Sequence, residues 1–158
     1  MSKIKSLKKL AEIIGQEKKK GKKVVLANGI FDLLHVGHIR YLKEAKSLGD
    51  ILIVAVNDDQ SARLIKGEGR PLIPVEERVE VLSAISYIDY LVKFPQRTVE
   101  EVISTLKPDI QAKGTDYTVE TVPERETVES YGGKIAITGD PKLHSTSAIL
   151  EKMKLKEH

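Results

Sequence analysis

No cysteine occurs among the 158 residues of the chain. Disulfide bonds, thiolate metal sites and a cysteine nucleophile are therefore excluded. Long hydrophobic runs are also lacking. No stretch approaches the roughly 20 apolar residues that a membrane-spanning helix requires, and none follows the lysines near the start as in a signal peptide. We expect no membrane segment, and the cytoplasm is the simplest location.

Aromatic residues make up only 4% of the chain, and neither sign of charge is in large excess. The 26 basic and 23 acidic residues leave a net charge of +3, which is too balanced to indicate a surface for nucleic acid. One basic run, KKKGKK at 18–23, is typical of a solvated connection, and few rings are present to stack on bases. Nucleic acid is therefore not an expected partner.

The apolar content, by contrast, is sufficient for a core. Hydrophobic residues account for 41% of the sequence and charged residues for 31%, in a chain whose length is typical of one compact domain. No internal repeat, low-complexity tract or Pro/Ser-rich linker divides it. We expect a single domain over residues 1–158, which includes an amphipathic helix over about 6–20 at its start.

Apolar runs and helical patterns alternate along the chain. Runs typical of buried strands occupy 23–29, 51–58, 109–114 and 134–139, and a fifth lies within 87–94. Helical patterns occupy 36–48, 75–85, 98–108, 122–133 and 145–154. This order predicts an α/β fold, a single doubly wound, Rossmann-like domain with a five-stranded parallel sheet. Its ligands should bind beyond the carboxyl ends of the strands, near a switch in strand order.

The stretch NGIFDLLHVGHIRYL at 28–42 follows the first predicted strand and carries two histidines three positions apart. If a helix begins directly after His35, that residue lies at its entrance and His38 lies in its first turn, so both can face one ligand. Free backbone N–H groups and the helix dipole attract an anion such as phosphate at this place. Gly37 has no side chain, so a phosphate can come close to the backbone.

Two other interpretations of the histidines are open. A His-x-x-His pair can be satisfied by ordinary hydrogen bonds in a structural role, and the spacing alone does not separate that role from phosphate binding. A catalytic zinc site is less favoured, because it usually needs three protein ligands, cysteine is absent, and no acidic residue stands at helical spacing within the motif. The position after a strand and the small residue between the histidines favour phosphate.

The longer stretch NGIFDLLHVGHIRYLKEAKSLGD at 28–50 resembles the first signature of the HxGH nucleotidyltransferases. This superfamily includes glycerol-3-phosphate cytidylyltransferase and phosphopantetheine adenylyltransferase. Later segments are similar, in order and spacing, to the D-glycero-β-D-manno-heptose 1-phosphate adenylyltransferase domain of the bifunctional ADP-heptose synthesis protein. They are LIVAVNDDQSARLIKGEGRPLIPVEERVEVLSAISYIDYLVKF, LKPDIQAKGTDYT, ESYGGKI and STSAILEKM, so the resemblance covers nearly the whole chain.

The resemblance implies an enzyme that transfers a nucleotidyl group, here in ADP-heptose and lipopolysaccharide core biosynthesis. A phosphate oxygen of the acceptor attacks the α-phosphorus of a nucleoside triphosphate in line, and pyrophosphate leaves without a covalent enzyme intermediate. Such a reaction asks the protein mainly for positioning and for stabilisation of charge on the phosphoryl group. Mg²⁺ is the expected cofactor, carried mainly by the triphosphate, and no dedicated protein metal site is expected.

By the resemblance, the catalytic residues are His35, His38, Ser145 and Thr146. The histidines would donate hydrogen bonds to the triphosphate as the bond to pyrophosphate breaks. The hydroxyls stand at the entrance of the last predicted helix and would hold the β- and γ-phosphates, although a plain helix cap is the alternative there. The nucleotide would also contact Asn28, Gly29, Ile30, Phe31, Gly37, Asn57, Lys142 and His144.

The acceptor substrate is expected to contact Asp32, Lys66, Arg70, Lys113, Asp116 and Tyr117. Asp32 could instead anchor its loop or meet a magnesium-bound water. Lys66 and Arg70 belong to KGEGRP, which we interpret as a glycine-flanked loop suited to a sugar phosphate, with plain surface charge as the alternative. The segment AKGTDYT at 112–118 follows the fourth predicted strand and should approach the same rim.

The second signature departs from that of the cytidylyltransferases, in which an arginine leads an RTEGIST-like segment. Here the corresponding stretch is GDPKLHSTSAIL at 139–150, with Lys142 and His144 but no arginine. This difference favours a purine triphosphate over CTP, and ATP is the first choice. The stretch GDPKLH also differs from the usual loop of the heptose subfamily, so the choice between adenine and guanine stays open.

We therefore expect an adenylyltransferase that acts on a nucleoside triphosphate and a sugar 1-phosphate. The bifunctional relatives carry a sugar kinase domain upstream, and here a separate kinase would supply the sugar 1-phosphate. Relatives are often dimers, which makes a homodimer an expectation, although no segment marks its interface. Three alternatives are a glycerol-3-phosphate cytidylyltransferase-like activity, FMN adenylyltransferase activity, and a nucleotide-binding regulatory module without catalysis.

Overall fold

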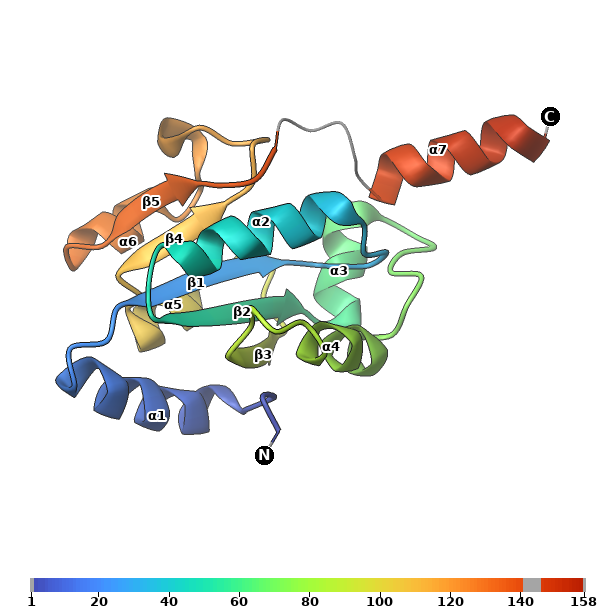
Figure 1. The fold of residues 1–158 in the computed structure, drawn as a ribbon. Coiled ribbons are helices and arrows are strands. Elements are labelled where there is room, and N and C mark those ends of the chain that lie inside the picture. Colours follow the sequence, from blue (N-terminus) through green and yellow to red (C-terminus); the bar gives the residue numbers. More distant parts are fainter. Residues whose placement is uncertain (1, 141–145, 158) are drawn as a thin grey trace.

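The computed structural model describes residues 2–140 and 146–157, with side chains of the last helix described over 149–154. Figure 1 shows its helices and strands. In chain order they are α1 (Leu7–Lys19), β1 (Val24–Gly29), α2 (Val36–Ser47), β2 (Ile51–Asn57), α3 (Asp59–Lys66), α4 (Val75–Ser83), β3 (Tyr90–Phe94), α5 (Glu100–Leu106), β4 (Ile110–Lys113), the 3₁₀ turn η1 (Val119–Thr121), α6 (Arg125–Ser130), β5 (Lys134–Ile137) and α7 (Thr146–Glu157).

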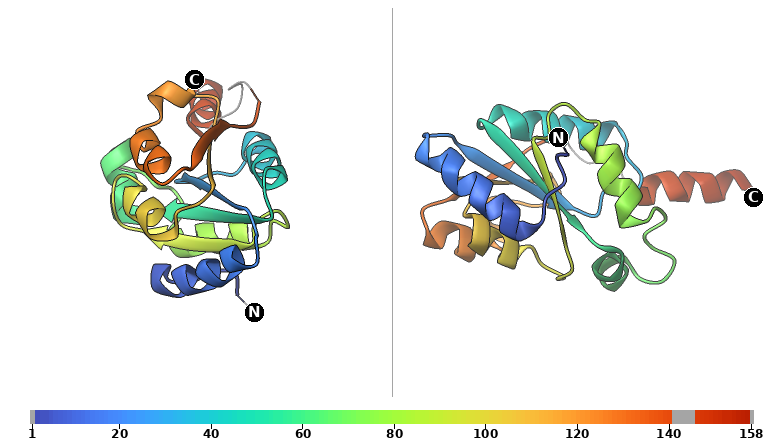
Figure 2. Two further views of the ribbon diagram at one scale, coloured as in Figure 1. Left: turned by 90° about the vertical axis from the view of Figure 1, so that its left-hand side faces the viewer. Right: turned by 90° about the horizontal axis from the view of Figure 1, so that it is seen from below.

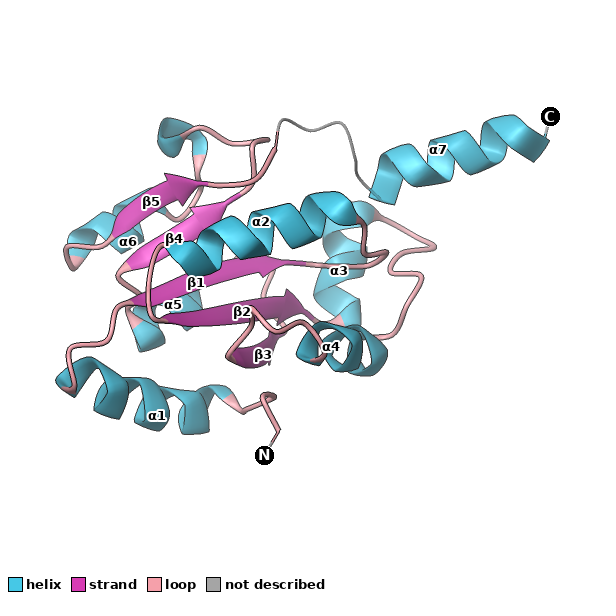
Figure 3. Ribbon diagram, in the orientation of Figure 1, coloured by secondary structure: helices cyan, strands magenta, loops and turns pink. Residues whose placement is uncertain are grey.

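The five strands form one sheet in the order β3-β2-β1-β4-β5, and every neighbouring pair is parallel (Figure 3). From β1 the chain builds outward through β2 to β3, then returns to the other side of β1 for β4 and β5. The order therefore switches between β1 and β4, which is where a doubly wound sheet opens a crevice for ligands. This arrangement confirms the predicted α/β fold with five parallel strands.

Helices cover both faces of the sheet, which explains why the central strands are apolar without alternation (Figure 2). Along β1, Val25 and Ala27 pack in one core with residues of α2 and α4. The alternate residues Val24 and Leu26 pack in a second core with α1, α5 and α6. The β1–α2 connection thus leads from the carboxyl end of the central strand to the helices on the first of these faces.

One helix was not expected. Asp58, which was expected to end the second strand, instead caps α3, and its Oδ1 accepts a hydrogen bond from the backbone N–H of Ser61 at 2.8 Å. Lys66 is the last residue of this helix, so its placement in a loop was wrong. The helix is eight residues long, and its larger apolar side chains, Leu64 and Ile65, are exposed, whereas the small residues Ser61 and Ala62 are buried.

A further pairing covers the edge of the sheet. The segment before α1 lies beside β3, where the backbone N–H of Lys5 donates to the carbonyl of Leu91 at 2.9 Å. The N–H of Leu91 in turn donates to the carbonyl of Lys3 at 2.9 Å. These bonds occupy backbone groups that an edge strand would otherwise expose. Among the helices that the structure describes, none combines the length and apolar character needed to span a membrane.

Candidate active site

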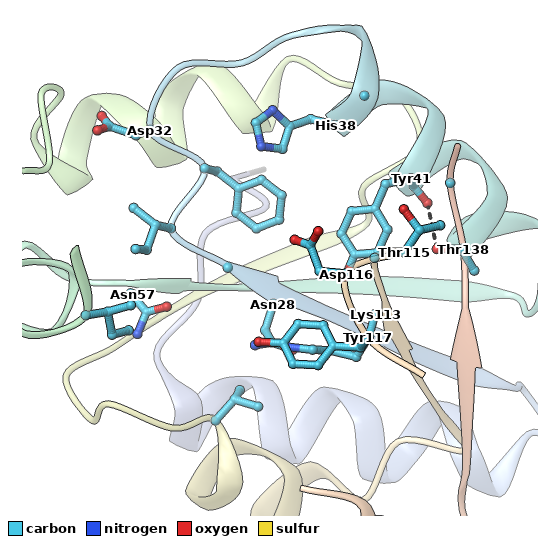
Figure 4. Close-up of a pocket in the computed structure, with 18 of the residues that line it drawn as sticks. Asn28, Asp32, His38, Tyr41, Asn57, Lys113, Thr115, Asp116, Tyr117 and Thr138 are labelled. Carbon is cyan, nitrogen blue, oxygen red and sulfur yellow. Dashed lines mark hydrogen bonds between the residues drawn. The ribbon is translucent and has the colours of Figure 1, made fainter. Parts of the chain in front are cut away.

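A cavity of about 480 Å³ opens at the carboxyl ends of β1 and β4, at the switch in strand order. Figure 4 shows the side chains that line it. Every predicted site residue before residue 141 contributes to its lining. These are Asn28, Gly29, Ile30, Phe31, Asp32, His35, Gly37, His38, Asn57, Lys66, Arg70, Lys113, Asp116 and Tyr117.

The remaining predicted residues belong to the second signature. Lys142, His144 and Ser145 lie outside the described residues. Thr146 is the first residue of α7, and its side chain is not described. Their assignment to the triphosphate stays a prediction.

The two histidines form a reciprocal cap at the start of α2. Nδ1 of His35 accepts a hydrogen bond from the backbone N–H of Gly37 at 3.1 Å. Nδ1 of His38 accepts one from the backbone N–H of His35 at 3.3 Å. The ring centroids lie 4.0 Å apart. The pair thus has a structural role as a helix cap and lines the cavity at the same time.

These bonds fix the chemical form of the imidazoles. Because Nδ1 of each ring accepts, a neutral ring carries its proton on Nε2 and can donate from there. Burial, together with the neighbouring His35, lowers the pKa of His38 to about 4. His38 is therefore a neutral hydrogen-bond donor near pH 7.

The backbone between β1 and α2 is held in an unusual conformation beside the histidines. Phe31 has a φ of +54°, in the left-handed region that residues other than glycine rarely adopt. Its buried ring lies 5.5 Å from the ring of His38, measured between centroids. A Cβ at Gly29 would come within 3.2 Å of this ring, so the glycine allows the ring to fold back over the strand end.

Asp32 anchors a second loop against the first. Its carboxylate accepts hydrogen bonds from the backbone N–H groups of Leu72 and Ile73, each at 3.0 Å to Oδ1, and from Nε of Arg70 at 3.0 Å. Burial opposes ionisation, but the two backbone N–H groups and the Arg70 guanidinium hold the pKa of Asp32 below its ordinary value. These contacts favour the loop-anchoring interpretation of Asp32, and direct contact with a substrate stays a prediction.

Arg78 of α4 joins both loops and was missed in the sequence. Its side chain is fully buried, and Nη1 donates to the carbonyls of Ile30 at 2.6 Å and Asn57 at 2.8 Å. Nε donates to the carbonyl of Ile73 at 2.8 Å, and Nη2 pairs with Asp59 at 2.8 Å. Arg78 therefore ties the loop before the histidines to the end of β2 and to the segment that Asp32 anchors.

The end of β4 supplies a cation to the cavity. Lys113 is buried, and its Nζ lies 4.4 Å from the centroid of the Tyr117 ring. Burial lowers the pKa of Lys113, while the charges of Glu124 and Asp116 act in the opposite direction. The predicted meeting of Lys113, Asp116 and Tyr117 at one rim is confirmed by their common place in the cavity lining.

Two buried polar residues on the same side, Gln111 and Glu124, were also missed. Nε2 of Gln111 donates to Glu124 Oε1 at 2.9 Å and to Asn28 Oδ1 at 3.2 Å. Its Oε1 is buried and accepts no hydrogen bond from the residues that the structure describes. An unsatisfied buried acceptor costs on the order of 1–3 kcal/mol.

Two further polar residues have structural bonds. The hydroxyl of Tyr41 donates to the carbonyl of Ala112 at 2.6 Å, and burial raises the pKa of Tyr41, which keeps the phenol protonated. Nδ2 of Asn57 donates to Ser61 Oγ at 3.2 Å and to the carbonyl of Gln96 at 3.3 Å. Asn57 thereby joins β2 to α3, and its contact with a nucleotide stays a prediction.

Among the residues that the structure describes, no three His, Asp or Glu side chains converge on a point where they could hold a metal ion. Asp32 is the acidic residue nearest to the two histidines in the sequence. Its carboxylate accepts the hydrogen bonds described above. Acidic groups that line the cavity include Asp116 and Glu124.

The chain is similar in sequence to known proteins. Residues 26–152 match the cytidylyltransferase-like family. A protein named bifunctional protein HldE from Citrifermentans bemidjiense is 52% identical over 96% of this chain, and one of the same name from Geobacter sulfurreducens is 49% identical over 96%. The chain spans 31% of the length of each of these relatives.

Solved structures agree with the fold. The lipopolysaccharide core biosynthesis protein from Thermoplasma volcanium is 31% identical, with a TM-score of 0.66, over 77% of this chain and 100% of that one. Pantoate-beta-alanine ligase from Francisella tularensis has a TM-score of 0.64 over 100% of this chain and 79% of its own. Its identity is only 18%, so that likeness concerns the fold alone.

Proposed function

The chain belongs to the cytidylyltransferase-like family, and from this we propose that it is a nucleotidyltransferase that joins a nucleoside monophosphate to a sugar 1-phosphate. The triphosphate is ATP, the acceptor is D-glycero-D-manno-heptose 1-phosphate, and the products are ADP-heptose and pyrophosphate. The observation that carries the proposal is the pair of histidines, His35 and His38, which line the cavity at the N-terminus of α2, with His38 neutral near pH 7.

The chemistry follows from this position. An oxygen of the acceptor phosphate forms a bond to the α-phosphorus, and the bond from that phosphorus to the β-phosphate oxygen breaks. Negative charge then grows on the departing pyrophosphate. The Nε2–H groups of the two histidines and the N-terminal end of α2 would donate hydrogen bonds to that charge. Neutral donors suit this task, since they need not exchange protons during the transfer.

The choice of a heptose acceptor rests on sequence similarity. The KGEGRP and AKGTDYT segments resemble the heptose adenylyltransferases, and the HldE relatives are about half identical over 96% of the chain. Because the chain spans under a third of those proteins, their activity is extended here as a proposal. Arg70 and Lys113, both in the cavity lining, supply positive charge for a sugar phosphate.

Three further features belong to this proposal. The triphosphate enters as its magnesium complex, with the ion held mainly by phosphate oxygens and water. A sugar kinase supplies the 1-phosphate, and the reaction takes place in the cytoplasm, where the triphosphate is made. A homodimer is proposed by analogy with relatives of the family.

Pyrophosphate release tests the function. The purified chain is incubated with Mg²⁺ and each of ATP, GTP, CTP and UTP, against heptose 1-phosphate, glycerol 3-phosphate and FMN, with acceptor-free controls. We expect release with ATP and heptose 1-phosphate. Release with CTP and glycerol 3-phosphate, or with ATP and FMN, would contradict the substrate assignment. Triphosphate binding without release for every pair would favour a nucleotide-binding regulatory module.

A further inference from the structure

The cavity has two sides that the sheet keeps apart. The histidines lie at the start of α2, on one face of the sheet. Leu26 packs on the other face, toward α1, α5 and α6, and because side chains alternate along a strand, Asn28 and the paired Gln111 lie on that same face. Figure 4 shows His38 on one side of the end of β1, and Asn28, Lys113 and Tyr117 on the other. The second side contains the buried row in which Gln111 holds Asn28 and Glu124.

The first side fits the triphosphate. Gly139 and Asp140, the first two residues of the second signature, lie at this side. The N–H of Gly139 donates to the carboxylate of Glu44 on α2 at 2.6 Å, and Arg40 of α2 pairs with Asp140. An in-line displacement places the attacking oxygen opposite the leaving pyrophosphate. If the pyrophosphate is held beside α2, the acceptor enters from the opposite side, where Glu124 lies.

Glu124 is equipped to read a hydroxyl group. It is only 3% exposed, yet it contributes to the cavity lining, just before α6. Gln111 fixes the carboxylate by donating to Oε1, so the group is oriented before any ligand arrives. A carboxylate accepts hydrogen bonds only, and the nearby charge of Lys113 compensates its own. This local chemistry suits a polyhydroxyl group.

We propose that Glu124, oriented by Gln111, accepts a hydrogen bond from a sugar hydroxyl of the acceptor and thereby selects sugar phosphates over acceptors that lack this hydroxyl. The inference rests on the function proposed above and adds a specificity-determining residue to it. A buried site built to pair with a hydroxyl discriminates strongly against analogues without one, because its own polar group is then left unpaired. Asn28, bonded to the same amide, lies beside this contact.

The test compares Glu124→Gln and Glu124→Ala with wild type. A matched control is Glu126→Gln, which changes an exposed carboxylate two residues away. We expect kcat/KM for heptose 1-phosphate to fall about 10- to 100-fold in both Glu124 variants, as for a lost hydrogen bond to a charged group. The Kd of ATP, measured without acceptor, should change less than about twofold, and Glu126→Gln should match wild type. Thermal unfolding checks that each variant is folded.

Deoxyfluoro analogues of the acceptor locate the contact. Replacing the contacted hydroxyl by fluorine removes its donor, so this analogue should be poor for wild type yet no poorer for Glu124→Ala. For analogues changed at any other hydroxyl, the fold-loss in kcat/KM caused by the analogue and that caused by Glu124→Ala should multiply, because the two changes act independently.

The outcomes separate the inference from the function on which it rests. If the Glu124 variants turn over heptose 1-phosphate as well as wild type does, the inference is wrong and the proposed function is unaffected. A raised Kd for ATP with unchanged acceptor kinetics would overturn it by placing the nucleobase at Glu124. No turnover by wild type with any sugar phosphate would overturn the proposed function, and the inference with it.

Discussion

The side chain of His38 is hydrogen-bonded to the backbone of His35, because Nδ1 of His38 accepts from the backbone N–H of His35 at 3.3 Å. The contact fixes the tautomer of His38 and turns Nε2–H into its available donor. Burial, together with the neighbouring His35, lowers the pKa of His38 to about 4, so the free energy of unfolding should depend on pH.

The first prediction concerns pH. In the unfolded chain His38 has an ordinary pKa near 6.5, so between about pH 6.5 and 4 the unfolded state binds a proton that the folded state does not. The free energy of unfolding should therefore fall as the pH falls through this window, by about 3 kcal/mol from this group. Denaturant titrations of wild type and His38→Asn across the window should show a steeper fall for wild type. Parallel curves would contradict the assignment of a buried neutral imidazole.

The second prediction concerns turnover. His38→Ala should lose on the order of 10²- to 10³-fold in kcat, because one donor to the developing charge is removed. The protein should remain folded, since the side chain lies at the cavity rim and contributes little to either core. Activity and denaturant unfolding are measured on the same preparation. A strongly weakened unfolding transition, with activity per folded molecule retained, would restore the purely structural interpretation of the histidines.

The third prediction concerns Arg78. Arg78→Met keeps much of the side-chain volume but leaves the carbonyls of Ile30 and Asn57 without this donor and removes the partner of Asp59. We expect the free energy of unfolding to fall by more than about 3 kcal/mol. The exposed Arg63→Met on α3 is the control, with an expected change within about 0.5 kcal/mol. Equal effects of the two substitutions would show that Arg78 does not join the loops.

The fourth prediction concerns the anchored loop. Asp32→Ala removes the acceptor for the amides of Leu72 and Ile73, so hydrogen exchange at both amides should become at least about 10-fold faster. Asp32→Asn keeps one acceptor oxygen and should show a smaller effect. Unchanged protection of these two amides in the alanine variant would mean that Asp32 does not hold the segment.

Much of the fold could be predicted from local patterns. The strands and most helices have apolar periodicities that lie within a few residues of their final bounds, and the histidine motif stands directly between β1 and α2. Helix α3 was not predicted: it buries only the small residues Ser61 and Ala62, and its larger apolar residues Leu64 and Ile65 stay exposed instead of joining the core. Lys66 was consequently assigned to a loop.

The site contacts that the sequence did not predict join distant segments. Gln111 reaches Asn28, 83 positions away, and the carboxylate of Asp32 meets the amide of Ile73, 41 positions away. No local spacing indicates such pairs. Arg78 did leave a signal, because it stands on the buried stripe of α4 with Val75 and Val79. A charged residue on an apolar face predicts a buried set of acceptors.

The measurement that tests the central claim most directly follows oxygen atoms through the reaction. The chain is supplied with ATP, Mg²⁺ and heptose 1-phosphate whose phosphate oxygens are labelled with ¹⁸O, and the products are weighed by mass spectrometry. Attack by the acceptor phosphate on the α-phosphorus predicts that all of the label remains in the ADP-heptose and none enters pyrophosphate. Label in pyrophosphate, or consumption of ATP without a sugar nucleotide, would contradict nucleotidyl transfer at this site.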